Sequence, residues 1–357
     1  MPVTGRWRQR FVRGDELTAL TRHGTSVYQQ PEWARAIEEG VGYRAVGVLS
    51  EAERPVVLSV WFEAQRGPLR LIGSPLPGCF TAYQRPLWLD GTDACAGHEA
   101  LQQHVAFVRR TGYASVECIV SDSGAEFAAV ARRTGATISE VPTIILDVAS
   151  SADAMWHGME SRGRNMVRKA ERSGVCVRQC RGTTEEITTY YGMLRGTFAK
   201  SGVRPPHPEE LYRALVRHLI PADRLLFLAA ELGGRTLAMA LFVHDDREMF
   251  FTSGTSLPGV GAYAPNNLIQ WHAIQFAVAR GLRLYDLGGT GRVLIDRFKT
   301  SFGGRRHAYV KASWRSPLMR AASSVYLRTR PSLERVWFLL SRLRGAGPAG
   351  DGATEDP

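Results

Sequence analysis

Residues 249–289, MFFTSGTSLPGVGAYAPNNLIQWHAIQFAVARGLRLYDLGG, carry the pattern that decides the fold. A β-rich run is followed by a loop with proline and glycine, by a long helical stretch that ends at a glycine, and by a second strand. The same order of strand, loop, helix, glycine and strand occurs around residues 69–120. The repetition predicts two similarly built α/β halves, with a boundary near residue 150.

Hydrophobic patterns outside these repeats predict further elements of the two halves. Residues 55–63 and 143–148 have the composition of strands, and two more strands, 225–232 and 236–244, are joined by a two-glycine turn. A single helix is expected over residues 151–174, with polar capping residues at its start and a glycine at its end. Mixed sheets flanked by helices are therefore the predicted fold class.

We expect four segments along the chain, with boundaries at 1–150, 151–315, 316–344 and 345–357. The first two are the α/β halves. The third has the pattern of two basic helices, of which the second is amphipathic, and such a helix either lies on an anionic membrane surface or packs on its own domain. The last segment is rich in glycine and is expected to be disordered.

The composition is that of a globular protein, with 44% hydrophobic and 22% charged residues in 357. No run approaches the roughly 18 apolar residues needed to span a bilayer, and the start of the chain lacks the apolar centre of a signal peptide. We therefore expect a cytoplasmic protein. The five cysteines are few and odd in number, which is typical of reduced thiols, and they form no metal-ligand set.

Positive charge is concentrated in two parts of the chain, whose formal net charge is +11. Residues 305–344 contain ten basic residues and one acid, a net charge of +9. Residues 162–181 contain seven basic residues and one acid, a net charge of +6. Such clusters indicate a polyanionic partner, which is RNA, an anionic membrane surface or a diphosphate-bearing substrate. Only four of the 45 basic residues are lysines, so each lysine stands out.

Residues 284–303, LYDLGGTGRVLIDRFKTSFG, hold one of these lysines. A strand ends near Asp286, two glycines break it, and the pair Phe298 and Lys299 follows. An ammonium group can stabilise the negative charge that develops on an acyl oxygen during aminolysis, whereas the ordinary role of a lone lysine is that of a surface residue with a buried stem. The stretch predicts an acyl-transfer site.

The loop GVGAYAP, residues 259–265, formally matches a glycine-rich loop between a strand and a helix. Such loops bind phosphate groups through free backbone N–H groups at the start of the helix. The alternative is a tight turn that needs glycine for its backbone conformation. Both interpretations stay open from the sequence.

Four runs together resemble one family: YQQPEWARAI (28–37), SRGRNMVRKAERSGV (161–175), YAPNNLIQWHAIQFAVARGLRLYDLGG (263–289) and FKTSFG (298–303). This combination is similar to the FemABX peptidyltransferases, over residues from about 25 to 315. The resemblance implies two GNAT-like domains. It also implies transfer of an amino acid from aminoacyl-tRNA to the side-chain amine of a peptidoglycan precursor, with no metal and no cofactor besides the tRNA co-substrate.

The resemblance also implies roles for particular residues. Lys299 with Phe298 matches the catalytic pair that contacts the acyl group and the tRNA end. A second set matches motifs that bind substrate: Trp33, Arg35, Arg162, Arg164, Tyr263, Asn266, Asn267 and Asp286. Among these, Arg35, Arg162 and Arg164 match basic residues that hold the diphosphate and sugar of the precursor. The chain departs from the family near Trp33, where Arg35 and Ile37 stand in place of a lysine.

Three functions are compatible with these features. The first is the aminoacyl-tRNA-dependent peptidyltransferase, whose acceptor is linked to a nucleotide or a lipid. The second is a GNAT-type N-acyltransferase that takes its acyl group from coenzyme A or a carrier, and acts on a polysaccharide, a peptide or a small-molecule amine. The third is a non-catalytic binder of RNA or membrane, against which the Phe298–Lys299 pair argues. The expected location is the cytoplasm, with peripheral contact at the inner face of the membrane.

Overall fold

The computed structural model describes residues 8–51, 55–83, 85–89, 97–121, 124–199, 203–291 and 293–321. Most of the expected basic helices, and all of the segment 345–357, lie outside the described residues. Within them, no helix combines the length and the apolar character that a bilayer crossing requires.

The first half contains both strands and helices, with β2 to β5 in direct succession. Its elements are β1 (Arg8–Val12), α1 (Gly14–Thr21), the 3₁₀ turn η1 (Val27–Gln29), α2 (Pro31–Val41), β2 (Arg44–Glu51), β3 (Pro55–Arg66), β4 (Leu69–Ser74), β5 (Leu87–Trp88), α3 (Gly97–Arg109), β6 (Ser115–Val120), α4 (Gly124–Arg133) and β7 (Thr137–Asp147).

The second half begins with helices and ends with a long strand. Its elements are α5 (Ala152–Gly158), α6 (Ser161–Arg172), β8 (Cys176–Gln179), α7 (Thr184–Ala199), α8 (Glu209–Leu219), β9 (Leu225–Leu232), β10 (Arg235–His244), β11 (Glu248–Ser256), the 3₁₀ turn η2 (Val260–Tyr263), α9 (Pro265–Ala279), β12 (Leu284–Gly289), α10 (Val293–Thr300) and β13 (Arg305–Arg315).

All of these strands belong to one mixed sheet in the described part of the chain. Its order is β1-β2-β3-β4-β6-β13-β7-β12-β11-β10-β9-β8, with β5 beside β3. The two sequence repeats form equivalent units, because β4 and β6 are parallel and joined through α3, while β11 and β12 are parallel and joined through α9. A parallel pair needs such a crossover connection. The predicted repeat is therefore confirmed as a repeat of structure.

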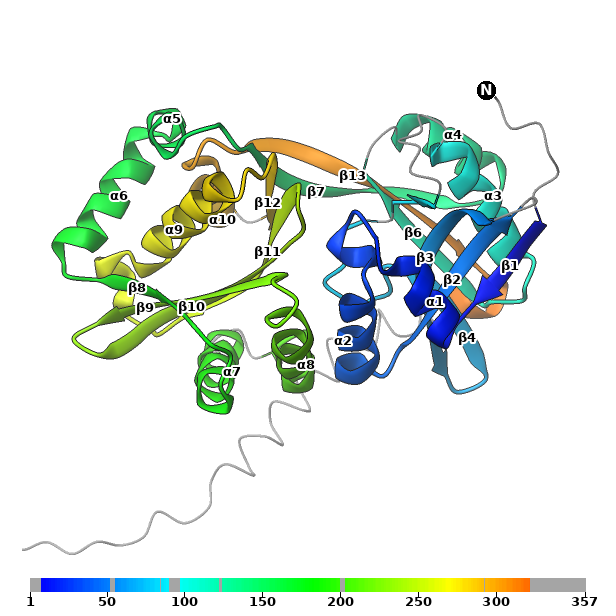
Figure 1. The fold of residues 1–357 in the computed structure, drawn as a ribbon, viewed down its shortest axis with the longest axis horizontal. Helices are drawn as coiled ribbons and strands as arrows, with labels where there is room; N and C mark the ends of the chain where they lie inside the picture. The colour runs from blue at the N-terminus through cyan, green and yellow to red at the C-terminus, as the bar shows by residue number, and fades with distance from the viewer. Residues whose placement is uncertain are drawn as a thin grey trace, which may run out of the picture.

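Two long strands connect the halves across the middle of the molecule (Figure 1). β7 pairs with β12 on one side and with β13 on the other. β13 pairs in turn with β6, so the last strand of the described chain lies between two strands of the first half. Residues 305–315, which the sequence analysis assigned to the second domain, thus form a strand between β6 and β7 of the first half.

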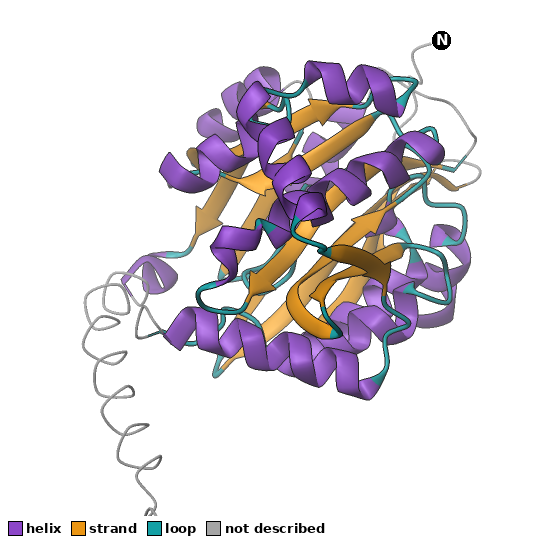
Figure 2. Cartoon of the chain, turned by 90° about the vertical axis from the view of Figure 1, so that its left-hand side faces the viewer, coloured by secondary structure: helices purple, strands orange, loops and turns teal. Residues whose placement is uncertain are grey.

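Helices cover both faces of the second half. α6 and α9 lie above strands β8 to β10 in Figure 1, and α7 and α8 lie below them; Figure 2 shows helices crossing the strands of this half from the outside. α2 of the first half packs against α8 of the second half. The contact is close, because a Cβ atom added to Gly40 of α2 would lie 2.4 Å from the Cα of Leu211 in α8.

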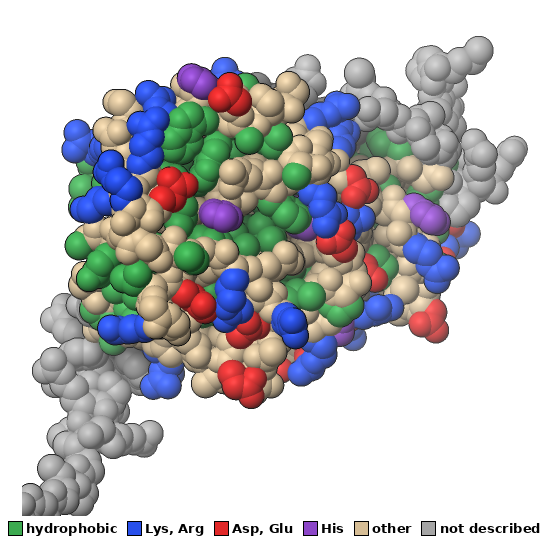
Figure 3. All heavy atoms as spheres, turned by 60° about the vertical axis from the view of Figure 1, so that its left-hand side comes forward, with side chains coloured by type: hydrophobic (Ala, Val, Ile, Leu, Met, Phe, Trp, Pro, Cys, Tyr) green, Lys and Arg blue, Asp and Glu red, His purple; other side chains and the backbone are tan. Residues whose placement is uncertain are grey.

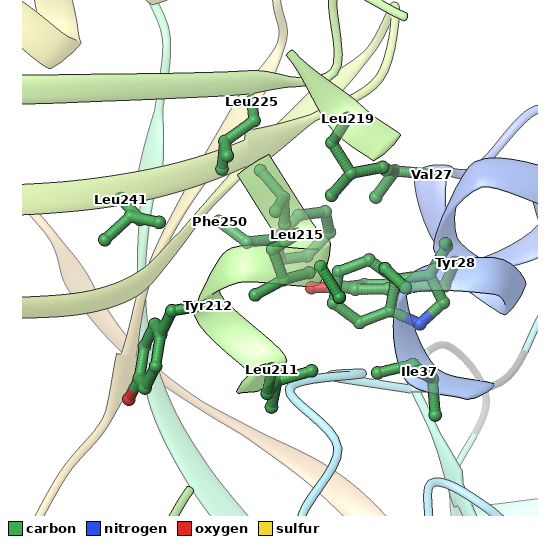
Figure 4. Packing of buried hydrophobic residues seen from close by; sticks show 14 of the residues in the cluster. Val27, Tyr28, Ile37, Leu211, Tyr212, Leu215, Leu219, Leu225, Leu241 and Phe250 are labelled. Atoms are coloured by element: carbon green, nitrogen blue, oxygen red, sulfur yellow. The ribbon is translucent and has the colours of Figure 1, made fainter. Parts of the chain in front are cut away.

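The contact between α2 and α8 belongs to a hydrophobic core that both halves share. Ile37 and Tyr28 of the first half lie in it beside Leu211, Leu215 and Phe250 of the second (Figure 4). Burial of this apolar surface holds the halves together. This shared core therefore fixes the position of the first half relative to the second.

The expected helix over residues 151–174 is interrupted. α5 ends at Gly158, and Met159 and Glu160 are extended before α6 begins at Ser161. The N–H of Glu160 donates to the carbonyl of Ser301 at 3.0 Å, and a Cβ atom on Gly163 would lie 2.4 Å from the same carbonyl. The prediction of one helix is wrong here, because a contact with the chain after α10 replaces the local helical hydrogen bonds.

Candidate active site

A gap opens between β11 and β12, the parallel strands of the second half. The two strands pair only from Glu248 to Phe250 and from Leu284 to Asp286. Beyond this point β11 continues beside β10, and β12 follows β7 with a change of register after Asp286. Strands that part in this way leave backbone groups available to a ligand.

A cavity of about 230 Å³ lies at the gap. The second half contributes Phe250, Phe251, Thr252, Asp286, Gly288 and Gly289 to its wall, and β13 contributes Tyr309. The first half contributes the remaining residues, which are Tyr28, Phe80, Thr81, Ala82, Ile119, Val141, Pro142 and Thr143. The cavity is therefore built from both halves of the molecule.

Lys299 lies directly behind the wall of this cavity. It is in α10, its exposed fraction is only 6%, and its Nζ donates to the carbonyls of Gly288 at 2.8 Å and Gly289 at 2.6 Å. An ammonium group has three N–H donors, and these two carbonyls are the partners it has among the described residues. Its third N–H has no hydrogen-bond partner among the described residues.

Burial lowers the pKa of Lys299 from 10.5 to about 8, because water no longer solvates its charge, and Asp286 and Asp296 partly oppose the shift. Its protonation thus changes near the pH at which enzymes commonly work. A group with a shifted pKa beside a cavity is a recurrent property of active sites.

The contribution of Lys299 to acyl transfer should consequently decrease as the pH rises through about 8. Below this pH the group is protonated and can stabilise negative charge; above it the neutral amine cannot. The measurement is the transfer rate from neutral to alkaline pH, divided by that of Lys299→Arg, whose guanidinium stays charged throughout. A ratio that does not change with pH would contradict the role of the ammonium charge.

Asp286 fixes the same stretch of backbone from the other side. Its carboxylate, in a residue only 6% exposed, accepts hydrogen bonds from the Tyr309 hydroxyl at 2.6 Å, the Gly288 N–H at 2.7 Å and the Thr143 hydroxyl. Gly288 has a φ of +80°, which glycine adopts without a steric penalty. Asp286 and Lys299 therefore hold the N–H and the carbonyl of a single glycine.

A second, larger cavity of about 490 Å³ shares Tyr309 with the first. Its wall contains four arginines, Arg85, Arg247, Arg305 and Arg306, together with Asp147 and Glu248. Glu248 binds Arg85 at 3.0 Å and also accepts from the Tyr83 hydroxyl. The rings of Tyr83 and Tyr309 are 5.2 Å apart, so this aromatic pair stands beside both cavities.

The start of α9 offers few free backbone donors. Pro265 has no N–H, and the N–H of Asn267 donates to the Ala264 carbonyl at 3.1 Å. Two of the first three helical positions therefore have no N–H free for a phosphate group. Ala264 and Gly259 both have positive φ, as expected for a tight turn.

Residues 160–316 match the family model of the acetyltransferase (GNAT) domain. We refer to these matched residues as the GNAT domain. The GNAT domain contains the gap between β11 and β12, and it also contains Lys299. The comparison with curated protein sequences gives no match.

Solved structures extend the likeness of the GNAT domain to the whole fold. FemX has 12% sequence identity and a TM-score of 0.66, over 90% of this chain and 99% of that protein. The C-terminal domain of a predicted lysylphosphatidylglycerol synthetase from Agrobacterium fabrum has 11% identity and a TM-score of 0.56, over 87% and 95%. A tandem GNAT protein from the clavulanic acid biosynthesis pathway has 12% identity and a TM-score of 0.52, over 86% and 98%. The predicted fold of two tandem GNAT-like domains is thereby confirmed.

Some of the expected site residues lie in or behind the wall of the smaller cavity. Asp286 lines it and Lys299 lies behind it, while the Phe298 ring is half-buried, with its centroid 5.3 Å from that of Phe302. Trp33 is fully buried, and its indole N–H donates to the hydroxyl of Thr81, a residue of the cavity wall, at 2.9 Å. Trp33 thus supports the wall from behind.

The other expected residues lie apart from the cavity wall. Arg35 is exposed on α2, 4.0 Å from Glu32. Arg162 donates to the carbonyl of Arg297 in α10, and Arg164 donates to that of Met159. Tyr263 and Asn266 are exposed beside the start of α9, where Asn267 is buried. None of these residues lines either cavity within the described part of the chain.

Sequence reasoning missed several residues of the smaller cavity. Tyr309 and Thr143 bind Asp286 from other strands, and Tyr28 lines the cavity from the first half. Tyr28 is the first residue of the run YQQPEWARAI that carries part of the family resemblance, so a signal for it was present. Tyr309 and Thr143 have no comparable signal, because their positions depend on strand register.

Basic side chains gather on the outer side of the second half. Figure 3 shows Lys and Arg side chains along the upper left edge of this face. Exposed basic residues of α6 are Arg162, Arg168, Lys169 and Arg172. Within the described residues, no group of three or more His, Cys, Asp or Glu is placed to hold a metal ion.

Proposed function

We propose that the protein is an aminoacyltransferase that moves an amino acid from aminoacyl-tRNA to an amine of a peptidoglycan precursor or a related cell-wall or lipid acceptor. The observation that carries the proposal is the buried Lys299, whose Nζ binds the carbonyls of Gly288 and Gly289 at the gap between β11 and β12 and whose third N–H has no partner among the described residues. The names of the structures with this fold support it, since FemX and a lysylphosphatidylglycerol synthetase are among them.

The residues suggest how the reaction proceeds. The acceptor amine attacks the ester carbonyl of the aminoacyl group, a C–N bond forms, and the carbonyl oxygen becomes negatively charged. The free N–H of the Lys299 ammonium stabilises this oxygen. The C–O ester bond then breaks, and the ribose hydroxyl leaves with the proton that the amine loses. Holding donor and acceptor in one cavity supplies most of the rate enhancement.

Two features favour tRNA as the donor. The exposed arginines and the lysine of α6 provide positive charge for an RNA backbone. The start of α9 has only a limited set of free N–H groups for the diphosphate of coenzyme A, since Pro265 and Asn267 contribute none. We propose that no metal and no further cofactor takes part, and that the protein acts in the cytoplasm, at the inner face of the membrane.

A second candidate is an N-acyltransferase that uses acyl-coenzyme A. It is favoured by the match of residues 160–316 to an acetyltransferase model. The two candidates share the acceptor amine and the role of Lys299, and they differ in the donor.

A donor competition separates the two candidates. The purified full chain is given a nucleotide-linked or lipid-linked peptidoglycan precursor, with either a radiolabelled aminoacyl-tRNA pool or acetyl-coenzyme A, and a parallel sample contains RNase. We expect label on the precursor from the tRNA pool, and its loss with RNase. Acetyl transfer that is indifferent to RNase would support the second candidate, and no transfer from either donor would contradict both for this acceptor.

A further inference from the structure

The first turn of α10 presents three consecutive apolar side chains to solvent. The exposed fractions are 74% for Val293, 79% for Leu294 and 41% for Ile295. Proteins rarely leave such a run uncovered unless it binds something. These three residues, which we call the α10 tip, precede Lys299 on the same short helix. A surface that binds the α10 tip would therefore lie close to the candidate active site.

Arginines lie on α10 and contact it just beyond the α10 tip. Arg297 is exposed on the same helix, and Arg162 reaches it by donating to the Arg297 carbonyl. Arg306 has a side chain 67% exposed and binds Asp296, whose own side chain is only 8% exposed. Asp296, the acid of α10, is thus buried and already paired, while Arg162, Arg297 and Arg306 are exposed. The surface at this end of α10 therefore presents exposed apolar side chains next to exposed arginines.

This combination fits an anionic lipid surface better than RNA. Single strands of RNA bind through basic residues together with aromatic rings on which bases stack, and Val293, Leu294 and Ile295 have no rings. At a membrane interface, apolar side chains enter the boundary of the acyl chains while arginines bind anionic headgroups. Charge and polarity at the α10 tip both match this second arrangement.

We propose that the α10 tip inserts into the surface of an anionic bilayer. Lys299 and the cavity behind it are thereby held at the membrane surface. An acceptor carried on a lipid would reach the cavity without leaving the bilayer, and this consequence rests on the proposed aminoacyltransferase function. The membrane contact itself is independent of the reaction and can be measured without it.

The test is co-sedimentation of the full chain with vesicles of phosphatidylcholine, with and without phosphatidylglycerol. We expect tighter binding to the vesicles that contain phosphatidylglycerol, and a binding that weakens as salt is added. The double variant Val293→Ser, Leu294→Ser should lower the partition coefficient by about tenfold or more. Leu318→Ser tests the segment that follows β13 instead, because Leu318 is 63% exposed there; if the α10 tip makes the contact, we expect this variant to change the partition coefficient by less than about twofold.

Three other outcomes would overturn the proposed membrane contact. Vesicle binding by the double variant equal to that of the wild type would assign membrane contact elsewhere, for example to the basic segment that follows β13. Weaker binding to tRNA with unchanged binding to vesicles would assign the tip to an RNA partner. Loss of transfer to a nucleotide-linked, water-soluble precursor would place the tip in the reaction itself. If the wild type binds vesicles through the tip but transfers nothing, the proposed function fails and the membrane contact stands.

Discussion

Replacing Lys299 with methionine should lower kcat/KM for acyl transfer roughly 100- to 1000-fold, equivalent to about 3 to 4 kcal/mol of transition-state stabilisation. Methionine preserves much of the length and the apolar stem of lysine, but it has no N–H for the developing oxyanion. It also no longer holds the carbonyls of Gly288 and Gly289. The measurement is a single-turnover rate with labelled donor and saturating acceptor.

Lys299→Arg tests how much of the rate depends on a positive charge at this position and how much on the particular size and geometry of the lysine side chain. Arginine keeps a positive charge and N–H donors, so we expect a rate between that of the wild type and that of the methionine variant. Urea unfolding of both variants checks that each is folded at the assay temperature. A methionine variant as fast as the wild type would rule out Lys299 as the group that stabilises the oxyanion.

Replacing Asp286 with alanine should lower the free energy of unfolding by about 3 kcal/mol or more. Three donors lose their acceptor: the Tyr309 and Thr143 hydroxyls and the Gly288 N–H. A buried donor left without a partner retains its full desolvation cost, which exceeds the net gain from an ordinary hydrogen bond. The measurement is the urea midpoint and slope of the full chain.

Asp286→Asn is the matched control for this prediction. Its amide oxygen can still accept from Gly288, so we expect a smaller loss of stability than in the alanine variant. It also removes the negative charge that raises the pKa of Lys299, so the decline of activity with pH should move to a lower pH. An alanine variant as stable as the wild type would show that the carboxylate is not needed to hold the gap open.

The parts of the fold that follow from local patterns were predictable. The two repeats encode their parallel strand pairs within short stretches, because each stretch contains strand, loop and crossover helix in order. Lys299 was singled out from sequence, since lysine is rare in this chain and this one follows a broken strand. Asp286 lay in the same stretch, and the structure places it in the cavity wall. The roles of both residues stay predictions.

The rest of the site depends on contacts between distant residues. Tyr309 binds Asp286 only because β13 pairs with β7 in one register. The interruption between α5 and α6 depends on the carbonyl of Ser301, more than a hundred residues later in the chain. Helix propensity over residues 151–174 contains no information about that carbonyl. Tertiary contacts therefore determined the features that sequence reasoning missed.

The position of β13 has a consequence for synthesis of the chain on the ribosome. β6 and β7 both emerge long before β13, yet each has β13 as a neighbour in the finished sheet. Until residue 315 has been made, the facing edges of these two strands have no partner from β13, and open edges invite pairing with other chains. The first half thus begins to fold first but is completed last, and the nascent chain depends on its own late segment, or on a chaperone, to protect these edges.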